Sequence, residues 1–233
     1  MYQVWYNAFV ILKKKGKVMA SIYTGFSKLD NFGGSITDRS FVGVLGYPAV
    51  GKTSFVFDII KNNRKKKFLY VCDFFEVRNK RFLEISRLIK GDSKIIVVDE
   101  YYFDAVKFLE DLIAREEYYD FVVFDGLFRS DERYKVFSKI DEMEYRPTVI
   151  ATIYNEKYII EQKDYELSLG NTVDLAFFSK IFLIDHPAKR TSGKEFERLG
   201  VSDNEVIIHV FEKDGFNNQT CLFFDRESAR FYE

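Results

Sequence analysis

Apolar runs rich in β-forming residues alternate along the chain, from Phe41 onward, with segments whose apolar residues recur every three or four positions. In the second kind of segment, spacings such as Phe82, Ile85 and Leu88 indicate helices with one apolar face. The apolar runs, which we predict to be strands, are Phe41–Leu45, Phe68–Cys72, Ile95–Val98, Phe121–Phe124 and Val149–Tyr154. A repeated strand–helix order predicts an α/β fold with a mainly parallel, twisted sheet flanked by helices.

The pattern changes after Lys180. The stretches "KIFLI", "EVIIHVFE" and "QTCLFF" are strand-like with little helix between them, and "EKDGFNN" predicts the turn of a C-terminal antiparallel hairpin. Residues 2–18 alternate and then become basic, so we expect residues 1–20 to be an N-terminal extension, a strand or hairpin of unknown role. Because no Pro/Gly/Ser-rich linker follows, residues 21–233 are expected to form one domain.

Composition supports a large core and excludes few functions. Of 233 residues, 47% are hydrophobic and 18% aromatic, and the formal net charge is −1, so any nucleic-acid-binding surface must be local. Cys72 and Cys221 lie in apolar runs and predict buried free thiols in a reducing compartment. No apolar run approaches about 18 residues and no signal-peptide pattern opens the chain, so we expect a cytoplasmic protein without a membrane partner.

A glycine-rich stretch after the first predicted strand carries the clearest chemistry. It fits G-x-x-x-x-G-K-[ST], the Walker A pattern, at every fixed position, directly between a predicted strand and a predicted helix. Backbone N–H groups of such a loop point at phosphate oxygens, the lysine adds a point charge, and the threonine offers a hydroxyl to Mg²⁺. The predicted nucleotide-binding residues are Gly46, Tyr47, Pro48, Ala49, Val50, Gly51, Lys52, Thr53 and Ser54.

A nucleoside triphosphate site also needs a carboxylate at the end of a nearby strand. Two strands supply one: "IIVVDE" ends at Asp99 and Glu100, and "FVVFDG" ends at Asp125. The apolar runs alone leave both alternatives open.

The segment upstream of the phosphate loop, "IYTGFSKLDNFGGSITDRSFVGVLG", resembles the lead-in of the RecA/RadA/KaiC superfamily of P-loop ATPases. The residues that match its "TG-x-x-x-LD-x-x-x-GG" phrase are Thr24, Gly25, Leu29, Asp30, Gly33 and Gly34. Later segments, among them "FLYVCDFFEVRNKRFLEIS" and "FVVFDGLFRSDERYK", follow in the order found in archaeal RadA-like proteins. The resemblance, closest to a stand-alone RadA paralogue (RadB-like or KaiC-like), implies a RecA-like core over about residues 21–224, binding ATP and Mg²⁺.

The resemblance also implies roles for single residues. Asp125 becomes the metal carboxylate beside Thr53, and Asn155 falls where the family places a polar residue that senses the γ-phosphate, although a strand-capping Asn explains it equally well. Many relatives have glycine where Ala49 stands. Lys52 would act on the phosphates during hydrolysis.

The family's water-activating glutamate is displaced here. Phe74 or Phe75 occupies its expected position, which leaves Asp73 and Glu76 as alternative bases and predicts weak or conditional hydrolysis.

The loops that face DNA in RecA-like recombinases correspond here to two segments. The first carries Arg129, Arg133 and Lys135 beside Phe128, a set suited to phosphate contacts and base stacking, whereas the second mixes charges of both signs. Ordinary solvated surface is the simpler interpretation of both. Lys213, in "EKDG", occupies the position from which relatives reach a neighbouring subunit's triphosphate, and a solvated hairpin lysine is the simpler interpretation here too.

Together these features predict a RecA-like ATPase with weak basal activity, a paralogue in DNA recombination or repair. The implied partners are ATP, single-stranded DNA or a recombinase, and further copies of the chain in a homo-oligomer. The alternative is a KaiC-like regulatory module that acts through nucleotide-dependent assembly without binding DNA. A nucleotide or small-molecule kinase would need an acceptor pocket and an arginine-bearing lid, and the sequence shows neither.

Overall fold

The computed structural model describes residues 21–73, 81–89, 91–99, 103–127, 133–142, 147–154, 160–163, 166–169, 178–186, 204–212 and 217–233. The predicted extension, residues 1–20, lies outside this range. The turn predicted at "EKDGFNN" lies partly outside it.

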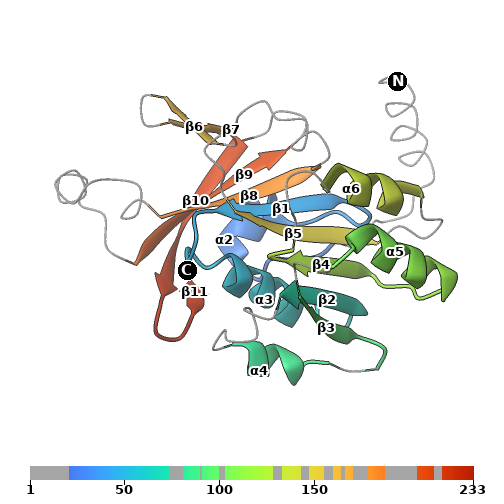
Figure 1. The fold of residues 1–233 in the computed structure, drawn as a ribbon. Coiled ribbons are helices and arrows are strands. Elements are labelled where there is room, and N and C mark those ends of the chain that lie inside the picture. Colours follow the sequence, from blue (N-terminus) through green and yellow to red (C-terminus); the bar gives the residue numbers. More distant parts are fainter. Residues whose placement is uncertain are drawn as a thin grey trace.

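Strands form the centre of the molecule (Figure 1). They are β1 (Phe41–Gly46), β2 (Phe68–Asp73), β3 (Lys94–Val98), β4 (Phe121–Asp125), β5 (Thr148–Tyr154), β8 (Lys180–Asp185), β9 (Glu205–Glu212), β10 (Asn217–Asp225) and β11 (Arg230–Tyr232). The described residues join them in one sheet of order β11-β10-β9-β8-β1-β5-β4-β2-β3. Pairing is parallel from β8 through β3 and antiparallel from β8 to β11. The predicted α/β class, with its C-terminal antiparallel hairpin, is confirmed.

Helices cover both faces of the sheet. They are α2 (Ser27–Leu29), the adjoining helical turn η1 (Asp30–Gly34), α3 (Lys52–Asn62), α4 (Phe82–Ser86), α5 (Ala105–Ala114) and α6 (Arg133–Glu142). Alternate residues of each central strand point to opposite faces. Phe68 and Tyr70 of β2 therefore pack with α3 in one core, whereas Leu69 and Val71 pack with α5 in a second core. The result is a three-layer arrangement in which the central strands are buried on both faces.

Two aspects of the structure depart from the sequence-based expectations: three short strands that were not predicted, and the partial exposure of one cysteine. Strand β11 and the small antiparallel pair β6 (Ile160–Lys163) and β7 (Glu166–Leu169) were not anticipated. Both cysteines are free, as predicted, but only Cys72 is buried, because Cys221 lies half-buried on β10. Among the helices described, none is long and apolar enough to cross a membrane.

Candidate functional site: a nucleotide-binding loop

The phosphate loop connects β1 to α3 at the carboxyl end of the parallel strands (Figure 1). Its two motif glycines are required by close packing. A Cβ at Gly51, where φ is +99°, would lie 2.8 Å from the Phe231 ring, and a Cβ at Gly46 would lie 2.7 Å from the carbonyl oxygen of Ile184. Close packing against β8 and β11 therefore leaves no room for a side chain at either glycine.

Ala49 also adopts left-handed backbone, with φ of 59°. This is a conformation that glycine adopts without steric cost and other residues rarely take. The geometry explains why related loops carry glycine at this position.

Lys52 begins α3 and is only 7% exposed. Its ammonium group donates hydrogen bonds to the carbonyl oxygens of Gly46 and Tyr47, each at 2.9 Å. The positive charge is thus held over the loop, next to the amino end of a helix, where an anion is favoured.

Asp125, at the end of β4, faces the phosphate loop and is 1% exposed. Its Oδ1 accepts hydrogen bonds from Thr53 at 3.2 Å and from Thr152 at 2.6 Å, and its Oδ2 accepts one from Tyr70 at 2.7 Å. Burial raises the pKa of Asp125, and the three hydroxyls and the charge of Lys52 oppose that rise. Threonine hydroxyl and carboxylate oxygens are ligands that suit Mg²⁺.

Asp99 follows β3, at the far edge of the sheet from the loop. Strands β5, β4 and β2 lie between β3 and β1, a separation of about 19 Å at the usual strand spacing. Glu100 lies outside the described residues. Of the two sequence candidates, the structure brings only Asp125 to the loop.

Of the two alternative bases for hydrolysis, the structure describes only Asp73. Asp73 ends β2 and pairs with Val98, whose side chain packs on the core beneath α5. Since Cys72 pairs with Asp125 and packs in the α3 core, alternation directs Asp73 to the opposite face from Asp125. Glu76 lies outside the described residues, as does the γ-phosphate sensor candidate Asn155.

The predicted DNA-contacting residues are described only in part. Arg133 begins α6, and Lys135 is exposed on the same helix. Helix α6 packs through Ile140 on the core beneath α5, on the sheet face opposite α3. Arg129 and Phe128 lie outside the described residues, as does Lys213.

No protein-family profile and no curated protein matches the chain. Solved structures do. One of them, an ATPase domain, aligns over 99% of this chain and 97% of its own, with a TM-score of 0.60 and 14% identity. A DnaB-like replicative helicase, solved in a study of its interactions with primase, aligns over 97% of this chain and 66% of its own, with a TM-score of 0.58 and 14% identity.

A third similar structure is the KaiC-like protein PH0186 from Pyrococcus horikoshii OT3, which aligns over 92% of this chain and 98% of its own, with a TM-score of 0.58 and 12% identity. The fold is that of the RecA-like P-loop ATPases. At these identities the likeness shows the fold alone. It does not show the more specific resemblance to a RadA paralogue.

In this RecA-like fold the "TG-x-x-x-LD" segment has a structural part, and we call the hydrogen-bonded group of Thr24, Gly25 and Asp30 the clasp. The Asp30 carboxylate accepts hydrogen bonds from the backbone N–H and hydroxyl of Thr24, each at 2.8 Å, and from the N–H of Gly25 at 3.1 Å. Gly25 and Gly33 both have positive φ. Asn62, in the last turn of α3, donates to the carbonyl oxygen of Thr24 at 3.5 Å, so the clasp is joined to the helix that follows the loop.

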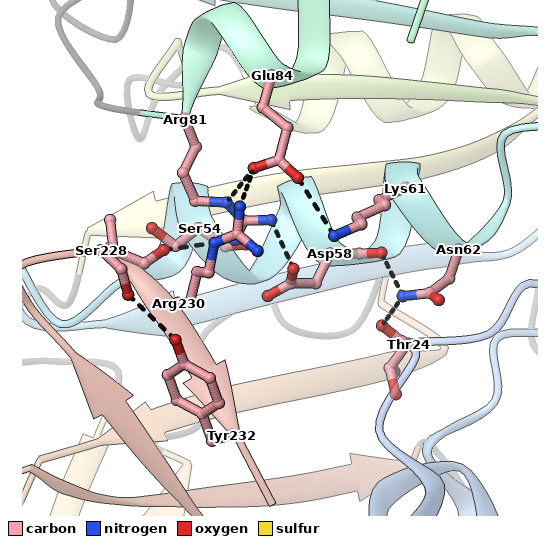
Figure 2. Close-up of polar contacts among 11 residues, drawn as sticks. Thr24, Ser54, Asp58, Lys61, Asn62, Arg81, Glu84, Ser228, Arg230 and Tyr232 are labelled. Carbon is pink, nitrogen blue, oxygen red and sulfur yellow. Dashed lines mark hydrogen bonds and ion pairs between the residues drawn. The ribbon is translucent and has the colours of Figure 1, made fainter.

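Arg81 forms a buried polar network that the sequence did not single out (Figure 2). Its guanidinium donates to Asp58 at 2.6 Å and to the carbonyl oxygen of Ser54 at 3.1 Å, both in α3, and it forms an ion pair with Glu84 of α4 at 3.4 Å. It also reaches the carbonyl oxygen of Ala229 at 3.4 Å. Arg81, only 2% exposed, thus connects the phosphate-loop helix, α4 and the turn before β11.

Proposed function

We propose that this chain binds ATP together with Mg²⁺ through its phosphate loop and hydrolyses it slowly. The observation that carries the proposal is the approach of Thr53 to Asp125, at 3.2 Å, beside the buried ammonium group of Lys52. In RecA-like folds this combination suits a triphosphate and its metal ion. The likeness to an ATPase domain and to a KaiC-like protein supports the proposal at the level of fold.

Each residue has a distinct part in this proposal. Backbone N–H groups of the loop and the ammonium group of Lys52 hold β- and γ-phosphate oxygens. The Thr53 hydroxyl and the Asp125 carboxylate hold Mg²⁺, which neutralises phosphate charge when bound. Phosphoryl transfer needs little covalent help, so this positioning supports slow turnover even with the usual glutamate displaced.

The finer proposal is a role in DNA recombination or repair, as a partner of single-stranded DNA or of a recombinase. It is supported by the basic residues that follow β4 in the sequence, Arg129, Arg133 and Lys135. We also propose assembly into a homo-oligomer. The alternative, a KaiC-like regulatory module, is supported by the near-neutral net charge of −1 and by the likeness to the KaiC-like protein, which is nearly covered end to end.

Binding measurements with an ATP analogue, with and without Mg²⁺, test the site. Lys52→Ala is expected to weaken binding at least about tenfold, because it removes the charge that holds the phosphates. Asp125→Asn is expected to weaken only the Mg²⁺-dependent part.

Asp99→Asn is the matched control, since it makes the same change at the strand end that lies at the sheet edge. Thermal melts check that each variant folds, because Lys52 is buried and bonded to the loop. If Asp99→Asn abolishes the Mg²⁺ effect and Asp125→Asn does not, the metal site is wrongly assigned. Equal affinity of Lys52→Ala and the parent would contradict the nucleotide site itself.

A further inference from the structure

The carboxylate of Asp125 receives hydroxyl groups from three separate elements. Thr53 comes from α3, Tyr70 from β2 and Thr152 from β5, which places one donor in the helix after the loop and one in each strand flanking β4. Thr53 belongs to the phosphate-loop motif. The other two belong to no motif, and in the sequence they lie within apolar runs.

The hydroxyl of Thr152 has a fixed direction. The backbone N–H of Gly126 donates to Thr152 Oγ1 at 2.8 Å, so this oxygen acts as acceptor there and its own proton is directed to Asp125 Oδ1, 2.6 Å away. Thr152 is 3% exposed. One hydroxyl therefore fixes both the carboxylate and the peptide group that follows it.

Tyr70 contacts the other carboxylate oxygen, Oδ2, from the core beside α3. Its side chain is fully buried, its hydroxyl donates to Oδ2 at 2.7 Å, and its ring packs on Phe57 of α3 with centroids 5.5 Å apart. Phe57 lies one helical turn after Thr53, so the ring that carries this hydroxyl is held by the same helix that carries the proposed metal-binding threonine.

The acceptor capacity of the carboxylate is nearly filled by these contacts. A carboxylate offers about four lone-pair sites, two on each oxygen. Thr53 and Thr152 occupy Oδ1, and Tyr70 occupies one site of Oδ2. The carboxylate therefore has little freedom to rotate, and its remaining capacity lies on Oδ2.

We propose that Tyr70 and Thr152 are positioning residues that orient Asp125 for Mg²⁺. This inference rests on the proposed function, because it concerns the metal part of the same site. Groups that hydrogen-bond to metal-binding carboxylates fix their orientation, and losing one commonly lowers metal affinity about 10-fold to 100-fold. The two residues join three neighbouring strands, β2, β4 and β5, into one support for the metal ion.

Tyr70→Phe and Thr152→Val test this inference, since both keep the apolar volume and remove one hydroxyl. The affinity of a fluorescent ATP analogue is measured in EDTA and across a MgCl₂ titration. We expect both variants to bind the analogue as the parent does in EDTA and to require about 10-fold to 100-fold more Mg²⁺ for the full increase in affinity. Thr152→Ser, which keeps the hydroxyl, is expected to restore the parental Mg²⁺ dependence.

Tyr119→Phe is the matched control. Its hydroxyl also donates to a carboxylate, that of Glu117 at 2.7 Å, but it precedes β4 at the end opposite the phosphate loop. Parental Mg²⁺ dependence in Tyr70→Phe and Thr152→Val overturns the inference while leaving the proposed function standing. An equal loss of affinity in EDTA also overturns it, because a purely structural role has that effect. If the parent itself shows no Mg²⁺ dependence, the proposed metal site fails as well.

Discussion

The residue whose conformation departs most from its usual preference in the phosphate loop is Ala49. Left-handed backbone costs a non-glycine residue about 1–2 kcal/mol, and the alanine at this position has φ of 59°. Contacts on either side of Ala49 offset that cost, because Val50 is fully buried and Gly46 packs on Ile184 of β8. Ala49 therefore carries local backbone strain that glycine would not have at this position.

Single substitutions can distinguish Asp73 from Glu76 as the base for the proposed hydrolysis. Asp73 is directed to the sheet face opposite Asp125, so Asp73→Asn is expected to hydrolyse ATP at the parental rate. Glu76→Gln is expected to lower the slow rate by a factor of about 100 with ATP affinity retained, as for the loss of a general base. Single-turnover measurements with radiolabelled ATP have the required sensitivity.

The two amide variants serve as controls for each other, because both remove one negative charge close to the end of β2. A slow Asp73→Asn variant beside a normal Glu76→Gln variant would contradict this assignment and show that Asp73, at the end of β2, acts on the phosphates. Parental rates in both would mean that neither is the base. The chain would then act as a nucleotide-binding module whose output is assembly or partner choice.

At the scale of elements, Arg81 holds three of them together. Arg81→Met is expected to cost up to about 3–5 kcal/mol of unfolding free energy, because it leaves the largely buried carboxylate of Asp58 without the guanidinium that hydrogen-bonds to it. A double variant with Asp58→Leu removes that uncompensated charge and is expected to be more stable than Arg81→Met alone. Chemical denaturation of the four proteins in the cycle measures both effects.

This destabilisation depends on pH with a definite sign. Burial raises the pKa of Asp58, and Arg81 opposes the rise, so losing Arg81 raises that pKa further. A raised carboxyl pKa costs the folded state stability above that pKa and costs nothing once both states are protonated. The stability gap between the parent and Arg81→Met is therefore expected to narrow as pH falls from neutral towards 4. A gap that stays constant would show that packing, not charge, dominates.

How much of each element could be predicted depends on whether its signal is local. Strands β1 to β5 follow from apolar runs, and the phosphate loop follows from its spacing. The three-residue strand β11 has too few residues for a pattern, and β6 and β7 have four each. Tyr70 and Thr152 read as core residues, because only the strand order β5-β4-β2 brings their hydroxyls to Asp125. For the same reason Asp99 and Asp125 could not be separated from the runs alone.

For the whole molecule, single-stranded DNA distinguishes the two proposed roles. The DNA role predicts that single-stranded DNA raises the ATPase rate and binds with a salt-dependent affinity. Lys135→Ala is expected to reduce the slope of that salt dependence by about 1, as for the loss of one phosphate contact. Lys107→Ala, at an exposed lysine of the neighbouring α5, is expected to leave that slope unchanged.

The KaiC-like role predicts a different result. The ATPase rate would not respond to single-stranded DNA, and ATP would instead change the sedimentation coefficient of the chain. An identical salt slope in Lys135→Ala and the parent would remove this lysine from any DNA-binding surface, whichever role holds.

The order in which the chain is made bears on when the phosphate loop becomes competent. The loop begins at Gly46, which pairs with Ile184 of β8 and with Tyr154 of β5. Its second glycine, Gly51, packs against the rings of Phe224 in β10 and Phe231 in β11. Contacts of such high sequence separation form late, because closing long loops costs entropy before the contacts compensate for it. During translation, therefore, the loop is synthesised early but is held in its final shape only after β8, β10 and β11 have left the ribosome. A nascent chain stalled before β10 should be unable to capture ATP.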